Sequence, residues 1–446
     1  MAKLNFRKIG EKYLYSNIFG DWAFVTKGEH KKIQNNRSEI KRLSTPQKWI
    51  VDRFYEREAT NNFRFASLHV VKLTNRCNQK CTYCFASARS IKDKECDMNI
   101  ATARKIVDFI CLIPEKDKRI EFHGGEPTLN FEVMKEIVSY AKKKIKNIIF
   151  GVRSNFTNMD DQKAAWFKEN NIIVGTSLDG PKEIHDKNRL FEGGNGTYDT
   201  VNHWFNRMES IYNLPVSIIP VMTKISLANY REIIDEYVAK HSPEIYLKYL
   251  FNMGYGKSNQ NVGYDMDAFK KFWIDSMEYI IELNKKGKII KERNAEIIMK
   301  KIIHNPPHVF LDFQEPCGLV RGAVTYDYNG DIYPCPHSID FKEFKLGNVF
   351  DNTYSEIVNL KISKSLIDKS RLNWRQCKEC VYKPWCGTCI IDTYSRTGSF
   401  ALTKEDITCR LHKFMFDYIF LKMQDKPARK ILIEWIKYGK IQNQLL

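Results

Sequence analysis

Three cysteines at short, fixed intervals constrain this chain more than any other feature. Cys77, Cys81 and Cys84 are separated by three and then two residues, just after an apolar run, residues 68–73, that predicts a β-strand. Three thiolates at this spacing fit three corners of a four-iron cluster and leave one iron without a protein ligand. A structural zinc site is the alternative, but it normally takes four protein ligands, and no fourth Cys or His lies at a suitable spacing. The sequence therefore predicts an iron–sulfur cluster with one open iron.

The remaining cysteines indicate further metal chemistry. Of the twelve cysteines, two stand alone, at 96 and 111, and seven fall late in the chain. These seven are Cys317, Cys335, Cys377, Cys380, Cys386, Cys389 and Cys409. Clustered cysteines in an intracellular chain favour metal or cluster ligation over disulfides. A pair of zinc ribbons stays open as an alternative, although seven ligands do not divide into two sets of four.

The N-terminus and the net charge indicate the cellular location of the protein and the kind of partner it binds. Residues 1–15 carry charges throughout, unlike a signal peptide, and no apolar run is long enough for a membrane span, so we expect a cytoplasmic protein with no membrane contact. The net charge of +18 is spread along the chain. Solvated lysine-rich helices explain much of it, and a basic surface also favours an acidic partner such as a peptide or nucleic acid. No nucleic-acid-binding motif is present, so a nucleic-acid partner is not expected.

The chain of 446 residues is expected to form five segments. They are residues 1–64 (lead-in or docking segment), 65–256 (core), 257–310 (helical linker), 311–415 (cysteine-rich domain) and 416–446 (helical tail). The lead-in contains strand-like runs at 13–16 and 22–25, then a charged helical stretch that Pro46 breaks. It is too small to be a catalytic domain, and is either a docking hairpin for a partner or a cover for the next domain.

Strand and helix patterns alternate through the core. The expected strands are 68–73, 119–123, 148–153, 172–178, 216–222 and 244–251, and the expected helices are 101–112, 131–144, 162–169, 197–211 and 227–240. Two further helices, 268–283 and 292–303, are expected in the linker. Units of this length imply an α/β fold with a parallel sheet and helices outside it. Functional groups of such sheets collect at the carboxyl ends of the strands.

Glycines and small polar residues follow these strands. Gly124 and Gly125 would let a ligand approach the backbone closely, and Glu126 would add a carboxylate that suits an ammonium group. The motifs at 153–158 and 177–181 offer small polar side chains that suit ribose hydroxyls.

Several single residues in these motifs have two interpretations. Asn158 and Asp179 are equally well explained by turns and caps. Arg189 could pair with a carboxylate or lie on the surface. His123 could pack or neighbour a ligand.

Taken together, these motifs resemble the radical S-adenosylmethionine (SAM) superfamily over residues 65–255. The resemblance implies a partial (β/α)6 TIM-like barrel in which the amino and carboxylate groups of SAM bind the open iron. Reduction of the cluster would then cleave SAM to methionine and a 5′-deoxyadenosyl radical that takes hydrogen from a substrate. The SAM-binding residues that it implies are Tyr83, Gly124, Gly125, Glu126, Asn155, Ser177 and Arg189.

The later cysteines resemble the SPASM extension of radical SAM enzymes, which holds two auxiliary four-iron clusters. By this resemblance Cys317, Cys335 and Cys389 would bind the first auxiliary cluster, and Cys377, Cys380, Cys386 and Cys409 the second, so three [4Fe-4S] clusters are expected. Family members with eight cysteines have one more just upstream of the position of Cys317, whereas residues 309–316 contain none. The first auxiliary cluster would therefore have an open iron for a substrate group, be closed by Asp312 or Glu315, or carry a solvent ligand.

Two details favour a peptide as substrate. In sulfatase maturases the cysteine that matches Cys335 is followed by an Asp that acts as base, whereas Pro336 and His337 follow here; His337 or Asp340 could substitute. The lead-in runs 13–16 and 20–22 resemble the start of His-Xaa-Ser-type peptide maturases.

We therefore expect a maturase that crosslinks side chains of a ribosomally made precursor peptide through a carbon–carbon or thioether bond. A flavodoxin or ferredoxin would supply electrons, an auxiliary cluster would accept one, and the basic lead-in and tail would contact a leader peptide, which an acidic sequence would suit. The alternatives are oxidation of a Ser or Cys to formylglycine, and a non-catalytic iron–sulfur or zinc module.

Overall fold

The computed structural model describes residues 4–17, 20–35, 65–251, 253–304, 314, 316–401 and 403–437. Pro46, Asp312 and Glu315, which the sequence analysis singled out, lie outside these residues, as does the end of the tail beyond residue 437.

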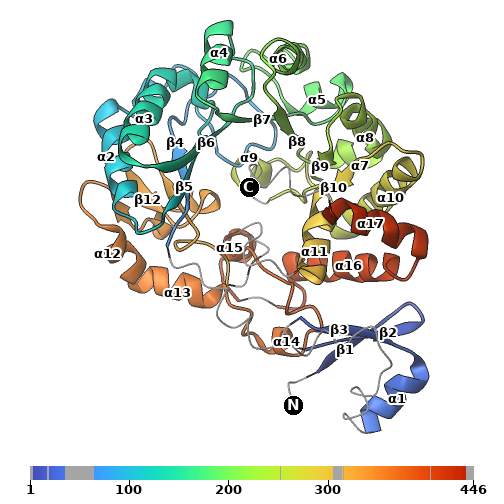
Figure 1. Ribbon diagram of the computed structural model, residues 1–446. Coiled ribbons are helices and arrows are strands. Elements are labelled where there is room, and N and C mark those ends of the chain that lie inside the picture. The colour runs from blue at the N-terminus through green and yellow to red at the C-terminus, as the bar shows by residue number, and fades with distance from the viewer. Residues whose placement is uncertain are drawn as a thin grey trace.

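A curved parallel sheet with helices on its outer side forms the centre of the molecule (Figure 1). Its neighbouring strands are β4 (Leu68–Lys72), β5 (Asp117–His123), β6 (Asn147–Arg153), β7 (Ile173–Ser177) and β8 (Val216–Ile219). The covering helices are α2 (Ile100–Cys111), α3 (Phe131–Lys144), α4 (Asp161–Glu169), α6 (Tyr198–Ser210) and α8 (Tyr230–Ala239). The predicted α/β barrel is confirmed, and its helices begin at typical caps: Asn99 accepts a bond from the Thr102 amide, and Asp160 from that of Lys163.

The predicted sixth strand, 244–251, is wrong in most of its length. Only β9 (Glu244–Ile245) forms, and it pairs with β10 (Lys291–Glu292) instead of β8. Side chains take the amides that a strand would need: the Leu247 amide donates to the Glu292 carboxylate (3.3 Å) and the Leu250 amide to the Tyr264 hydroxyl (2.8 Å). Residues 246–251 therefore form an irregular segment at the open side of the barrel.

On its other side the central sheet continues into the cysteine-rich region. Strand β11 (Ala323–Tyr326) pairs in parallel with β4, and β12 (Asp331–Tyr333) and β13 (Gly347–Asn348) follow in antiparallel order. The start of the cysteine-rich region is therefore hydrogen-bonded to the strand that precedes Cys77.

The described parts of the linker and the tail are largely helical. They contain α10 (Met266–Lys285), α11 (Arg293–Ile303), α16 (Ile407–Lys422) and α17 (Lys426–Lys437), which pack on one another. The remaining helices are α5 (Lys182–Asn188), α7 (Lys224–Ala228), α9 (Gly254–Ser258), α12 (Tyr354–Asn359), α13 (Lys361–Lys369), α14 (Arg375–Lys378) and α15 (Ile390–Thr397). Short 3-10 turns lie at Lys94–Cys96, Pro127–Asn130, Pro336–Ser338 and Lys342–Phe344. Within the described part of the chain, every helix is too short or too polar to cross a bilayer.

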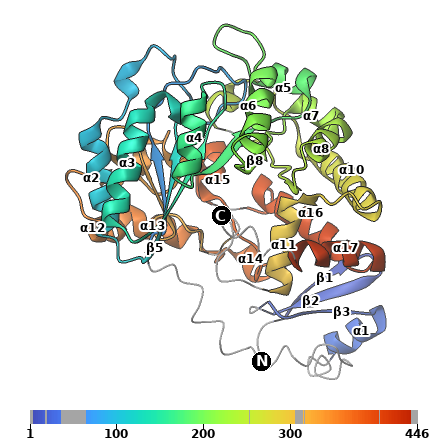
Figure 2. The ribbon, with the colours of Figure 1, turned by 45° about the horizontal axis from the view of Figure 1, so that its top comes forward.

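The described part of the N-terminal segment is a small antiparallel sheet with one helix. It contains β1 (Asn5–Ile9), β2 (Lys12–Ser16), β3 (Trp22–Val25) and α1 (Lys27–Asn35), and β1 was missed by the sequence analysis. Both ribbon views show this sheet beside α16 and α17, away from the helices α2 to α6 (Figures 1 and 2). Trp22 packs edge-on against Phe420 of α16, with ring centroids 5.4 Å apart. The segment thus covers the cysteine-rich part of the molecule, not the core that follows it in sequence.

Candidate active site

The three-cysteine loop leaves the end of β4 and is held by short-range contacts. The Cys77 sulfur accepts bonds from the Gln79 amide (3.3 Å) and from Nδ2 of Asn155 (3.5 Å). Burial and the neighbouring thiols raise the pKa of Cys77, and burial raises that of Cys81 to about 11. Since thiols must lose protons to ligate iron, metal binding here would release protons.

The Gly124–Gly125 turn lies directly against the backbone of this loop. The Gly125 amide donates to the Thr74 carbonyl (2.9 Å) and the Glu126 amide to that of Arg76 (2.7 Å). A Cβ at Gly124 would sit 2.5 Å from the Thr74 oxygen, and one at Gly125 would collide with the Arg76 oxygen. The sequence predicts that these glycines let a ligand approach the backbone. The structure shows that the cysteine loop itself needs glycine at both positions, because a side chain would collide with its backbone.

Protein side chains and amides hold the Glu126 carboxylate, which the sequence predicts to lie beside an ammonium group. The side chain is fully buried; one oxygen accepts from the amide (3.0 Å) and hydroxyl (2.6 Å) of Thr128 and from the Ser154 hydroxyl (2.9 Å), and the other from the Asn155 amide (2.7 Å). Burial raises its pKa, while these donors favour the ionised form. The carboxylate therefore ties the end of β5 to the end of β6.

Arg189 is buried beside the cysteine loop, so its interpretation as a surface arginine is wrong. The segment that carries it runs along the loop, with the Lys80 amide donating to the Leu190 carbonyl (2.8 Å). Its guanidinium donates to the Tyr83 hydroxyl (2.8 Å) and to Oε1 of Gln79 (3.2 Å). Among the described residues its buried Nε has no hydrogen-bond partner, which leaves one donor for a bound ligand.

Tyr83 connects this arginine to Asp179. The Tyr83 hydroxyl donates to the Asp179 carboxylate (2.6 Å), which also accepts from the Val221 amide (3.0 Å). Asp179 is fully buried, and burial raises its pKa. A turn or cap does not account for Asp179, which instead joins the cysteine loop to the ends of β7 and β8.

Other predicted residues lie at the same strand ends with different roles. Ser177 is the last residue of β7 and is half-buried. Asn158 donates to the Thr128 carbonyl (3.1 Å), which ties the loop after β6 to the turn after β5. His123 is half-buried at the end of β5, and burial lowers its pKa to about 4. Asn155 donates to the side chain of Asn78 (3.0 Å) as well as to Cys77.

Four of the later cysteines meet around one cavity. Cys377, Cys380, Cys386 and Cys409 line it together with His412. Burial, and then the charge of Cys409, raises the pKa of Cys377 to about 12. These four residues come from two stretches of chain, residues 377–386 and the first turn of α16, where the side chain of the N-cap residue Asp406 accepts a bond from the Cys409 amide (3.3 Å).

The stretches that carry the other three later cysteines are brought close through neighbouring groups. The Val320 amide donates to the Pro334 carbonyl (3.0 Å), which joins the stretch after Cys317 to the stretch before Cys335. The turn Pro336–Ser338 packs on α15, where Nδ1 of His337 lies 3.7 Å from the sulfur of Cys389. In the described part of the chain, no three His, Cys, Asp or Glu side chains converge on a point that fits one metal ion.

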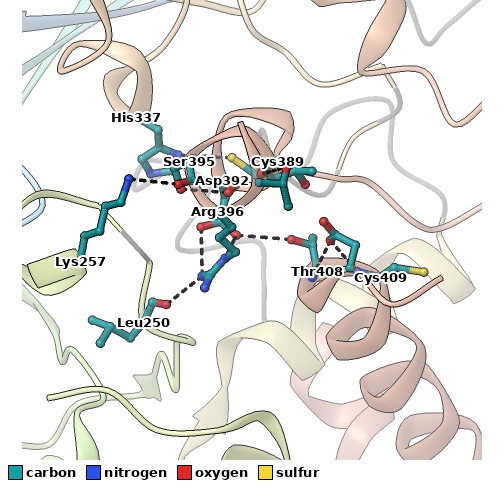
Figure 3. A network of polar contacts seen from close by, with 12 residues as sticks. Leu250, Lys257, His337, Cys389, Asp392, Ser395, Arg396, Thr408 and Cys409 are labelled. Carbon is teal, nitrogen blue, oxygen red and sulfur yellow. Dashed lines mark hydrogen bonds and ion pairs between the residues drawn. The ribbon is translucent and has the colours of Figure 1, made fainter. Parts of the chain in front are cut away.

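A polar network joins this region to the open side of the barrel (Figure 3). Arg396 of α15 pairs with Asp392 (3.0 Å) and donates to the Leu250 carbonyl (3.1 Å). Thr408, next to Cys409, donates to Asp392 (3.4 Å). The buried Asp392 carboxylate therefore links residues 246–251 to the stretches that carry Cys389 and Cys409.

Sequence reasoning missed one charged pair at the barrel mouth. The nearly buried Lys72 ends β4 and lies 3.8 Å from Asp327, which follows β11. The only sequence signal is a lysine that interrupts an apolar run. Asp340, named as a possible base, accepts a bond from the Ser87 hydroxyl (3.2 Å), so it faces the segment just beyond Cys84.

The chain matches two known protein families and has relatives among known proteins. The radical SAM superfamily model matches residues 71–237, and the SPASM iron–sulfur cluster-binding domain matches residues 317–381. The chain is 25% identical over 332 residues to a cysteine-type anaerobic sulfatase-maturating enzyme of Clostridium novyi, covering 72% of this chain and 86% of the relative. It is 30% identical to an uncharacterized protein of Methanocaldococcus jannaschii, covering 66% and 92%.

Two solved structures have a similar fold. Native anSMEcpe with bound AdoMet superposes with a TM-score of 0.69 at 22% identity, covering 81% of this chain and 99% of that one. Streptococcus suis SuiB bound to precursor peptide SuiA has a TM-score of 0.57 at 14% identity, covering 91% and 98%.

The fold and the cysteine groups together define an iron–sulfur enzyme built on a partial α/β barrel. The chain belongs to the radical SAM superfamily and carries a SPASM domain. This excludes the alternative of a non-catalytic iron–sulfur or zinc module.

Gly125→Ala tests the backbone contact on which the site depends. Because the added methyl group collides with the Arg76 carbonyl, we expect the variant to lose about four irons and to cleave SAM at least about tenfold more slowly. Iron analysis and chromatography of 5′-deoxyadenosine after anaerobic reconstitution measure both effects. Gly193→Ala is the matched control, since no atom lies within 4 Å of its added Cβ. Normal iron content and normal cleavage in Gly125→Ala would contradict the contact's importance.

Proposed function

We propose that this enzyme is a peptide maturase that crosslinks side chains of a ribosomally made precursor peptide. The observation that carries the proposal is the N-terminal sheet, which lies outside the barrel and docks on the SPASM region at a cysteine loop. Nδ2 of Asn5 donates to the carbonyls of Lys378 (3.3 Å) and Cys380 (3.2 Å), and the Ser16 hydroxyl donates to that of Val381 (2.5 Å). A separate docking unit is expected of an enzyme whose substrate is held at a distance from the modified residues.

The residues present fit three four-iron clusters and SAM. Cys77, Cys81 and Cys84 would hold the first, Cys317, Cys335 and Cys389 the first auxiliary cluster, and Cys377, Cys380, Cys386 and Cys409 the second. When bound and reduced, the first cluster with SAM supplies a 5′-deoxyadenosyl radical that abstracts hydrogen. We expect about twelve irons in the loaded protein.

The chain's own residues would place SAM and exclude water. The backbone at Gly124, Gly125 and Glu126 lies at the strand ends beside the cysteine loop, and Asn155 and Ser177 follow the next strands. Arg189 contributes a buried positive charge and an unused Nε donor, which suit an anionic group such as a carboxylate. Tyr83 and Asp179 hold Arg189 in place through hydrogen bonds, and the apolar contacts of Cys81, Tyr83 and Val262 shield the loop from solvent.

Oxidation of a Ser or Cys to formylglycine is the second candidate. The similarity to sulfatase-maturating enzymes favours it. The stretch Cys335–Pro336–His337, which lacks the expected acidic base, and the docked N-terminal sheet favour crosslinking. In either reaction an external flavodoxin or ferredoxin would deliver electrons.

The product of a turnover assay separates the two candidates. We expect the anaerobically reconstituted protein, given dithionite, SAM and its precursor peptide, to form 5′-deoxyadenosine and a peptide lighter by a pair of hydrogens. Tandem mass spectrometry should find two residues joined. A product that reacts with hydrazine would instead establish formylglycine. If SAM stays intact in fully iron-loaded protein, both candidate functions are contradicted.

An exposed aromatic side chain on the N-terminal sheet gives a test of leader binding. Phe6 of β1 is 45% exposed and stacks with Tyr15 at 5.4 Å between ring centroids. Because exposed aromatics anchor many interfaces, we expect Phe6→Ala to weaken binding of a fluorescent leader peptide about tenfold. SAM cleavage without peptide should not change.

The matched control for this variant is Phe350→Ala. Phe350 is 52% exposed and lies in the cysteine-rich region, just after β13. Equal leader affinity in Phe6→Ala and the parent, or an equal loss in both variants, would contradict docking on this sheet. Deletion of residues 1–60 should weaken leader binding further.

A further inference from the structure

One histidine approaches a cysteine sulfur in each group of later cysteines. Nδ1 of His337 lies 3.7 Å from the Cys389 sulfur (Figure 3), and Nδ1 of His412 lies 3.6 Å from the Cys386 sulfur. The two differ in one respect. Nδ1 of His412 is also 3.0 Å from the Gly387 carbonyl, whereas within the described residues Nδ1 of His337 has no other hydrogen-bond partner.

The ring of His337 is held between parts of the chain that surround the barrel mouth. It packs against Phe251, in the irregular segment after β9, with centroids 4.6 Å apart. On another side it meets Phe85, the residue after Cys84, edge-on at 6.3 Å. These contacts restrict the ring's rotation and keep Nδ1 directed at the sulfur.

The chemistry of the pair fixes the direction of the bond. A thiolate that ligates iron can only accept, so the proton of this bond sits on Nδ1 of the imidazole. The contact also argues against His337 as the fourth ligand of the first auxiliary cluster. Ligands of two different irons lie on different corners of a cluster, so a ligand nitrogen would lie farther from the Cys389 sulfur than 3.7 Å.

We propose that His337 donates an Nδ1–H hydrogen bond to the Cys389 thiolate and thereby raises the reduction potential of the first auxiliary cluster. The proposal rests on the proposed function in one respect, that Cys389 holds this cluster. Reduction adds negative charge, and a donor aimed at a ligating sulfur stabilises that charge. His337 is thus a positioning residue that makes the cluster a better electron acceptor. At His412 the same donor is shared with a carbonyl, so its effect on the second cluster is smaller.

Potentiometric titration monitored by EPR tests this directly. We use protein in which Cys77, Cys81 and Cys84 are replaced by Ala, so that only the auxiliary clusters remain, and add neither SAM nor peptide. His337→Phe and His337→Leu remove the donor, and His337→Asn keeps an N–H group on the same carbon. We expect both donor-free variants to shift the reduction equilibrium of one cluster at least tenfold toward its oxidised form. For a one-electron couple this shift lowers the midpoint potential by at least 59 mV.

The control variants decide between tuning and a structural role. His337→Asn should keep the parent midpoint, and His412→Phe should leave that cluster's midpoint unchanged. Equal midpoints in the parent and both donor-free variants would overturn the proposal. So would equal shifts in the Asn and Phe variants, or iron loss from both donor-free variants. Because the titration contains no peptide, failure of peptide modification would not alter its result.

Discussion

The close backbone contact between residues 74–76 and Gly124–Gly125 is the constraint on which the rest of the site depends. It brings the cysteine loop onto the carboxyl end of β5, and the buried Glu126 carboxylate then fixes β6 against it. Arg189 and Tyr83 join the same loop to β7 and β8 through Asp179. Side chains from four strand ends therefore meet around three cysteines, and the position of each depends on the loop's backbone.

A second constraint sets the cysteine-rich region relative to the barrel. Pairing of β11 with β4 extends the sheet that carries the first cysteine loop. The network of Asp392, Arg396 and the Leu250 carbonyl closes the other side. Between them, His337 contacts Phe85, Phe251 and Cys389, so the three groups of cysteines are joined by short paths through packed side chains. The N-terminal sheet joins this assembly at the Cys377–Cys386 loop and along α16, where Arg7 pairs with Asp417.

Periodicity and motif spacing predicted the barrel, most helices and the cysteine groups. They could not predict that strand 244–251 would fail, because the Glu292 and Tyr264 side chains that take its amides lie far along the chain. The same reason applies to Glu126, whose partners are fixed only once β5 and β6 pair, and to Arg189, whose burial depends on a loop a hundred residues earlier.

Transfer of deuterium from substrate to cofactor tests the central claim, radical modification of a peptide, most directly. Precursor peptide with deuterium at all carbon-bound positions would be incubated with loaded enzyme, dithionite and unlabelled SAM. The account predicts 5′-deoxyadenosine that carries one deuterium, together with a modified peptide. If 5′-deoxyadenosine forms without deuterium while the peptide remains unchanged, the peptide is not the hydrogen donor and the account is contradicted.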